Sequence, residues 1–258
     1  MDVEKVFDRF CASLANRKGI MTEDNIRYYW FDAMRTVEGE NFKLNHYTME
    51  YPYDSNVFDQ SSTGKKELDL LYDNERECIC MEIKFHRNPD TKSIYAHPDA
   101  AGSLFNDLIR LSKFKPSEIY KDDDYPLNWE KKNVRRFFLY VTDAEMDAYL
   151  NWDKTKHKQS SRYREEFDNY YNHAADKVWF LPAFYGIENV TNTFKVTALK
   201  SFAQKEMIEE MWNEEPYPIP EIRLLNRWDT PKDGCVSSPS FKKTSCHVRL
   251  YEVMKRNQ

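Results

Sequence analysis

The sequence predicts an α/β (α+β) protein in which helices pack against a β-sheet, and three features support this. Residues 3–16 and 22–37 place apolar side chains at helical spacing. Residues 42–53, 66–72 and 77–86 alternate between apolar and polar side chains, as strands do. Residues 135–141 form a nearly continuous apolar run, which suits a central strand buried on both faces.

Composition indicates a globular protein with a sizeable core. The chain has 258 residues, of which 41% are hydrophobic and 31% are charged. We expect a single domain over residues 1–258 with an elaborated C-terminal half. No apolar run is long enough to span a membrane, and the N-terminus lacks the pattern of a signal peptide, so we expect a cytoplasmic protein without a membrane partner.

Two helices are predicted near the N-terminus and a third follows residue 99. Thr22 is a suitable N-cap for the second helix, with Glu23 and Asp24 in its first turn. Asp99 is the expected N-cap of the third, whose apolar side chains include Leu104, Phe105, Leu108, Ile109 and Leu111. Its polar residues Asn106, Asp107 and Arg110 could face either water or the site described below, and water is the preferred interpretation.

The strands bring acids and a lysine together. A first strand is predicted over residues 42–53, with a bulge near His46. Residues 66–72 and 77–86 then form a hairpin around a turn at residues 73–76. The alternation places Asp69 on one strand opposite or diagonal to Glu82 on the next, and Lys84 shares the face of Glu82. Further strands are predicted at 178–184, 194–199, 219–228 and 246–254, and helices at 165–177 and 202–212.

Two carboxylates and a lysine on one half-buried face favour a divalent cation. Like charges repel, and each ion loses hydration on burial. Mg²⁺ offsets both costs, since it prefers carboxylate, water and phosphate oxygens. Lys84 could orient or deprotonate a water, or neutralise charge that develops on a phosphate. The alternative is an exposed hairpin whose acids merely face water.

With Asp69 and the Glu82-Ile-Lys84 triplet, the chain resembles the PD-(D/E)XK nuclease superfamily, although Leu68 stands where that name has proline. The resemblance covers about residues 20–145, leaving about 146–258 as the C-terminal elaboration. It implies a restriction-endonuclease-like mixed sheet flanked by helices, in the order α-β-β-β-α-β. It also implies a Mg²⁺- or Mn²⁺-dependent nuclease with Asp69, Glu82 and Lys84 as catalytic residues, of which Asp69 and Glu82 bind the metal. A homodimer is allowed by the resemblance alone.

Other residues are candidates for accessory roles. Glu67 shares the face of Asp69. Glu23 matches a glutamate that sometimes joins the site in the resembled family, although stabilising its helix end is the preferred interpretation. Candidate contacts to a nucleic-acid backbone are two basic groups, Lys65 and Lys66 before the hairpin, and Lys154, Lys156, Lys158, Arg162 and Arg164 further along. The alternative for each group is a solvated surface.

Several observations limit the function. The net charge of -5 gives no overall attraction for nucleic acid, so any binding depends on local basic patches and the metal. The five cysteines include no C-x-x-C pair, and we expect Cys78 and Cys80 to be small buried residues. The leading hypothesis is a DNA-cleaving nuclease, such as a restriction or defence endonuclease. Its rival is a catalytically inactive nucleic-acid-binding or interaction module with the same fold.

Overall fold

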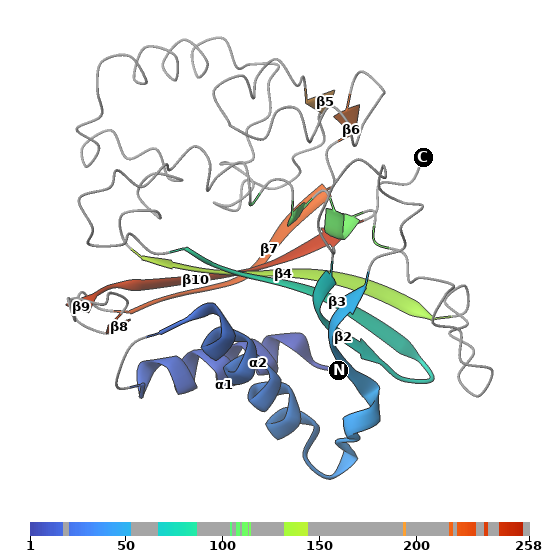
Figure 1. The fold of residues 1–258 in the computed structure, drawn as a ribbon, viewed down its shortest axis with the longest axis horizontal. Helices are drawn as coiled ribbons and strands as arrows, with labels where there is room; N and C mark the ends of the chain where they lie inside the picture. The colour runs from blue at the N-terminus through green and yellow to red at the C-terminus, as the bar shows by residue number, and fades with distance from the viewer. Residues whose placement is uncertain are drawn as a thin grey trace.

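A computed structural model describes the following parts of the chain: residues 1–17, 21–52, 67–86, 104, 107–108, 110–112, 114, 132–143, 193–194, 217–218, 221–230, 235–236 and 243–254. All structural statements below concern these residues. Within them the fold is mixed α/β, with a six-stranded mixed sheet flanked by helices (Figure 1). No helix in this part of the chain is both long and apolar enough to cross a membrane.

Two N-terminal helices form where the sequence predicts them. Helix α1 spans Val3–Ala15 and begins at Asp2, whose side chain accepts a hydrogen bond from the Lys5 N–H. Helix α2 spans Glu23–Glu38 and has a reciprocal cap, since Thr22 and Asn25 each accept from the other's backbone N–H. Gly39, at a φ of +57°, ends α2 in a conformation that favours glycine.

The main sheet has the strand order β1-β2-β3-β4-β10-β7. These strands are β1 Tyr47–Pro52, β2 Glu67–Asp73, β3 Glu77–His86, β4 Asn133–Asp143, β7 Glu221–Asp229 and β10 Cys246–Met254. Only the β3–β4 pair in this sheet is parallel. Two short pairs lie apart from it: β5 Thr193–Phe194 with β6 Tyr217–Pro218, and β8 Cys235–Val236 with β9 Lys243–Thr244.

Helices α1 and α2 lie together against one face of the sheet (Figure 1). A single buried cluster joins them to alternate residues of the strands, including Tyr72, Ile79, Met81, Leu139 and Val248. Strands β10 and β7 therefore complete the same sheet and core as the N-terminal elements. Leu104, Leu108 and Leu111, which are helical and buried, lie outside that cluster.

The first predicted strand is wrong in its first half. Residues 39–41 and 44–46 form the short 3-10 helices Gly39–Asn41 and Leu44–His46, and β1 begins only at Tyr47. Apolar residues at Phe42 and Leu44 imitate strand alternation, but Phe42 packs edge-on against Phe31 of α2, and Leu44 is exposed. The expected bulge near His46 is thus a helical turn.

The other described elements agree closely with the expectations. The hairpin strands, the central strand and the strand at 246–254 form as predicted, and Cys78 and Cys80 are fully buried. β4 lies inside the sheet between β3 and β10. The predictions at 165–177, 178–184 and 202–212 lie outside the described residues, as does the Asp99 cap, and only Phe194 of the 194–199 prediction is described.

Candidate metal-binding site

Asp69 of β2 and Glu82 of β3 meet in the interior of the sheet. The antiparallel register pairs Leu70 with Met81, so one step further along the strands Asp69 lies opposite Glu82. Both are buried, with 6% and 5% of their surface exposed. The Asp69 carboxylate also accepts the backbone N–H of Ile83 at 2.6 Å. An exposed hairpin with acids facing water is therefore ruled out.

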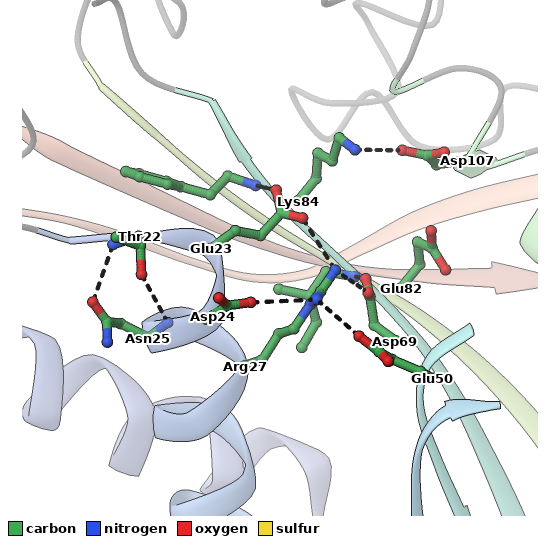
Figure 2. Close-up of polar contacts among 12 residues, drawn as sticks. Thr22, Glu23, Asp24, Asn25, Arg27, Glu50, Asp69, Glu82, Lys84 and Asp107 are labelled. Atoms are coloured by element: carbon green, nitrogen blue, oxygen red, sulfur yellow. Dashed lines mark hydrogen bonds and ion pairs between the residues drawn. The ribbon is translucent and has the colours of Figure 1, made fainter. Parts of the chain in front are cut away.

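A third acid reaches the same place from the helical segment after the hairpin. Asp107 is buried, with its Oδ2 3.5 Å from the Nζ of Lys84, and it also pairs with Arg110 (Figure 2 shows the Lys84–Asp107 pair). Arg110 in turn places its Nη2 3.2 Å from Oε1 of Glu82. The expectation that Asp107 and Arg110 face water is therefore wrong. Asn106 lies outside the described residues.

The sequence contains a pattern from which the burial of Asp107 could be predicted. Positions 104, 107, 108 and 111 lie on one face of a helix, and the other three are leucines that are buried here. A lone carboxylate inside an apolar stripe is costly unless it has a partner. Lys84 and Arg110 are those partners, which explains why the helix buries Asp107 rather than turning it to solvent.

Arg27 of α2 is the centre of the network and was not singled out from the sequence. Its Nη2 is 2.5 Å from Oδ1 of Asp69 and 3.1 Å from Oε1 of Glu23. Figure 2 draws both contacts. Its Nη1 is 3.5 Å from Asp24 and 3.9 Å from Glu50. The guanidinium thus connects the first turn of α2 to strands β1 and β2.

Glu23 has a wider role than stabilising its helix end. Besides pairing with Arg27, its carboxylate accepts the backbone N–H of Phe85 on β3 at 3.3 Å. The side chain therefore holds α2 against the strand that bears Glu82 and Lys84. The preferred interpretation from sequence, a helix-end role, was too narrow.

Glu50 adds strained backbone at the edge of this network. Its φ is +54°, in the left-handed region that a glutamate rarely adopts. The β1–β2 ladder pairs Met49 with Leu70 and Tyr51 with Leu68, and omits Glu50 and Asp69 between them. This conformation coincides with the approach of the Glu50 carboxylate to Arg27. Strain of this kind costs about 1–3 kcal/mol and is often found at functional sites.

We call this group the carboxylate cluster: Glu23, Asp69, Glu82 and Asp107 with Arg27, Lys84 and Arg110. Counted with every group ionised, its four carboxylates exceed its three cations by one formal charge. Burial raises the pKa of Asp69 to about 6; Glu23 and Asp107 add to the effect, while Arg27 and the Ile83 N–H oppose it. Burial, then Asp69 and Asp107, raise the pKa of Glu82 well above its usual range, against Arg110 and Lys84.

Lys84 and His86 extend the same face of β3. Burial alone would lower the pKa of Lys84, but Asp107, Glu23, Glu82 and Asp69 together outweigh it and raise the pKa. Lys84 is thus an ammonium at neutral pH, suited to neutralising charge rather than accepting a proton. Burial, with help from Lys84, lowers the pKa of His86 to about 3, so His86 is neutral beside Tyr140.

Of the other predicted residues, only Glu67 lies in the described part of the chain, and it is not part of the cluster. Glu67 begins β2, is only partly buried, and forms no ion pair within the described part of the chain. Lys65, Lys66 and the basic segment (Lys154, Lys156, Lys158, Arg162 and Arg164) lie outside the described residues. The structure therefore brings together Asp69, Glu82, Lys84 and Glu23, and adds Arg27, Asp107, Arg110 and Glu50.

The donor set fits a hard divalent cation only in part. Asp69 and Glu82 offer facing carboxylates of the kind that Mg²⁺ and Mn²⁺ prefer. Each carboxylate also has an arginine on it, and the described residues contain no group of three or more His, Cys, Asp or Glu arranged to hold a metal. A cation at Asp69 and Glu82 would therefore have to draw on water or substrate oxygens, and to move the arginines.

Comparisons with protein-family models, with curated proteins and with solved structures found no significant match to this chain.

Proposed function

We propose that this protein is a Mg²⁺- or Mn²⁺-dependent nuclease that hydrolyses phosphodiester bonds of DNA, in the manner of the PD-(D/E)XK superfamily that its hairpin resembles. The observation that carries the proposal is the buried Asp69–Glu82 pair, with Lys84 two residues further along β3. Burying such a group for stability alone is unfavourable, because desolvation and like-charge repulsion act together. A site that must attract a cation and a phosphate provides a reason to retain it.

The order of elements supports the same proposal. Helix α2 is followed by β1, β2 and β3, then by the helical residues around Asp107, then by β4, which is parallel to β3. This is the α-β-β-β-α-β order that the resemblance implies. A restriction-endonuclease-like core is thus part of the proposal, together with its use in restriction or defence.

The proposed roles follow from the contacts of each residue. Asp69 and Glu82 would hold the cation, whose contribution is to polarise a phosphoryl oxygen and acidify a bound water. Lys84, held by Asp107 and protonated, would neutralise charge that grows on the phosphate. Glu23 fixes α2 against β3 through the Phe85 N–H, which keeps these groups in register.

Cleavage assays test the proposal directly. Purified protein would be incubated with supercoiled plasmid, linear duplex and single-stranded DNA in Mg²⁺ or Mn²⁺, with EDTA as a control. The isosteric variants Asp69→Asn and Glu82→Gln should reduce cleavage by at least about a hundredfold, because each removes a charged metal ligand. Asp73→Asn is the matched control: Asp73 is buried on the same β2 strand but pairs with Lys132. Cleavage that survives EDTA or both site variants would refute the proposal.

One observation favours the rival, a catalytically inactive nucleic-acid-binding or interaction module. Asp69 and Glu82 already have arginine partners, as expected if the cluster is a structural ion network. In that case Asp69→Asn and Glu82→Gln would leave nucleic-acid binding unchanged, and wild-type protein would cut no substrate.

A further inference from the structure

Arg27 and Arg110, which contact Asp69 and Glu82, have properties that a fixed structural ion pair does not need. Arg27 comes from α2 and Arg110 from the helical segment after the hairpin, and each touches a different acid of the pair. Their side chains are 21% and 20% exposed, against 8% and 7% for Asp69 and Glu82. The two arginine side chains are therefore more exposed than the carboxylates that they contact.

Both arginines also contact other carboxylates besides Asp69 and Glu82. Arg27 contacts Glu23, and it lies near Asp24 and Glu50, whose side chains are 75% and 65% exposed. Arg110 pairs with Asp107 as well as Glu82. The Nε of Arg27 is buried without a hydrogen bond among the described residues, so its present position does not satisfy every donor. Losing Asp69 or Glu82 would thus leave neither guanidinium as an isolated buried charge.

We propose that Arg27 and Arg110 are exchange cations: they neutralise Asp69 and Glu82 in the metal-free protein, and they bind the phosphate of the DNA backbone once a divalent cation takes those carboxylates. This inference rests on the proposed nuclease function and describes how its site is regulated. It assigns substrate-binding roles to two residues that the sequence motif does not contain.

The charges of the cluster agree with such an exchange. Counted with every group ionised, it has one excess negative formal charge, which a divalent cation would turn into one excess positive charge. A bound phosphodiester would then restore neutrality. Guanidinium also suits the second role, because its planar set of N–H donors matches phosphate oxygens and it stays charged at any accessible pH. Metal and DNA should therefore bind cooperatively, with weak metal binding in the absence of DNA.

The test measures two affinities of the full-length protein that should change in opposite directions. Mn²⁺ affinity without DNA would be measured by calorimetry, and affinity for a short duplex would be measured in Ca²⁺. Arg27→Gln and Arg110→Gln should each bind Mn²⁺ about five- to tenfold more tightly, since a competing cation is gone. Each should bind the duplex more weakly, with a salt slope reduced by about one unit.

Arg35→Gln is the matched control, since Arg35 lies on the same helix and pairs with exposed Asp32 outside the cluster. It should change neither affinity. Arg27→Lys keeps a positive charge and replaces Arg27→Gln in the experiment if that variant does not fold. Its Mn²⁺ affinity should lie between that of wild type and that of Arg110→Gln. Unchanged or weaker Mn²⁺ binding in the arginine variants would overturn the exchange, as would unchanged duplex binding.

The same data separate this inference from the function on which it rests. If wild-type protein cuts plasmid and binds Mn²⁺ through Asp69, but the arginine variants show no gain in Mn²⁺ affinity, the exchange alone is wrong. If no variant binds Mn²⁺ and wild type cuts no DNA, both the nuclease function and the exchange are wrong.

Discussion

In two polar clusters of this protein, the pKa values of the carboxylates shift in opposite directions. In the carboxylate cluster, acids outnumber cations, and the pKa values of Asp69 and Glu82 are raised. Where β7 ends and β10 begins, Asp229 accepts from Arg249 at 2.6 Å and contacts His247 at 2.8 Å, with Ser245 beyond the imidazole. Burial would raise the pKa of Asp229, but Arg249 and His247 outweigh it and lower the pKa.

The difference indicates which cluster a bound cation would stabilise more. The contacts of Asp229 with Arg249 and His247 outweigh the effect of its burial. Asp229 also joins two strands whose register already pairs it with His247. The pKa values of Asp69 and Glu82 stay raised even though three cations lie in the same cluster. A group whose ionised form is disfavoured in the folded protein is the one that a divalent cation would stabilise. The pKa shifts of the two clusters therefore differ in direction, and the carboxylate cluster is the one whose buried charge a bound cation would offset.

The largest expected effect comes from removing the lysine of the carboxylate cluster. Lys84→Ala should lower cleavage by about 10²–10³-fold while leaving duplex binding nearly intact, because its ammonium acts where charge develops. Initial cleavage rates and filter-binding affinities would be measured side by side. Arg249→Lys in the other cluster should leave cleavage unchanged. Equal losses of cleavage and binding in Lys84→Ala would contradict the assigned role.

The same substitution should have opposite effects on stability in the two clusters. Without metal at pH 7.5, Asp69→Asn should raise the free energy of unfolding by about 1–2 kcal/mol, since it removes a disfavoured charge. Asp229→Asn should lower it by no more than about 1 kcal/mol, because the Asp229 side chain is 47% exposed and its ion pair is screened. Urea unfolding measures both. Two changes of the same sign would remove the distinction between the clusters.

The pH dependence of stability gives a smaller effect. Because the pKa of Asp69 rises from 3.8 to about 6 on folding, its contribution should decrease as pH rises between those values and stay constant above. Asp229 has a lowered pKa, so its contribution is present at neutral pH and is lost as pH falls through its folded-state value. The difference between wild type and Asp69→Asn, measured by urea unfolding from pH 4 to pH 7.5, should therefore grow with pH. A constant difference would contradict the raised pKa.

Much of this fold could be predicted from local patterns. The alternation at 66–72 and 77–86 fixed both hairpin strands and the meeting of Asp69 with Glu82, because strand faces follow from a period of two. The apolar run at 135–141 predicted the interior strand β4. The same rule failed at Phe42 and Leu44, where packing against α2 and short helical turns produced a similar pattern.

The carboxylate cluster could be predicted only in part. Asp69, Glu82 and Lys84 are close in sequence and share a hairpin, so local geometry brings them together. Arg27 and Arg110 are contributed by helices whose position depends on the tertiary packing, and their distance from the acids is not encoded in any short spacing. Asp107 was recognisable as a carboxylate within a leucine stripe, but its partner Lys84 is on strand β3, and only tertiary packing brings the two side chains together.

The central claim is that the carboxylate cluster is completed by a divalent cation, and thermal melting in the presence of Mn²⁺ tests it most directly. A ligand that binds only the folded state raises its stability by RT ln(1 + [L]/Kd), which is about 2.7 kcal/mol at a hundredfold excess over Kd. Melting curves would be recorded with a short duplex present, for wild type, Asp69→Asn and Asp229→Asn. We predict that Mn²⁺ raises the Tm of wild type and Asp229→Asn but not that of Asp69→Asn. No increase in wild type, or an equal increase in all three proteins, would contradict the claim.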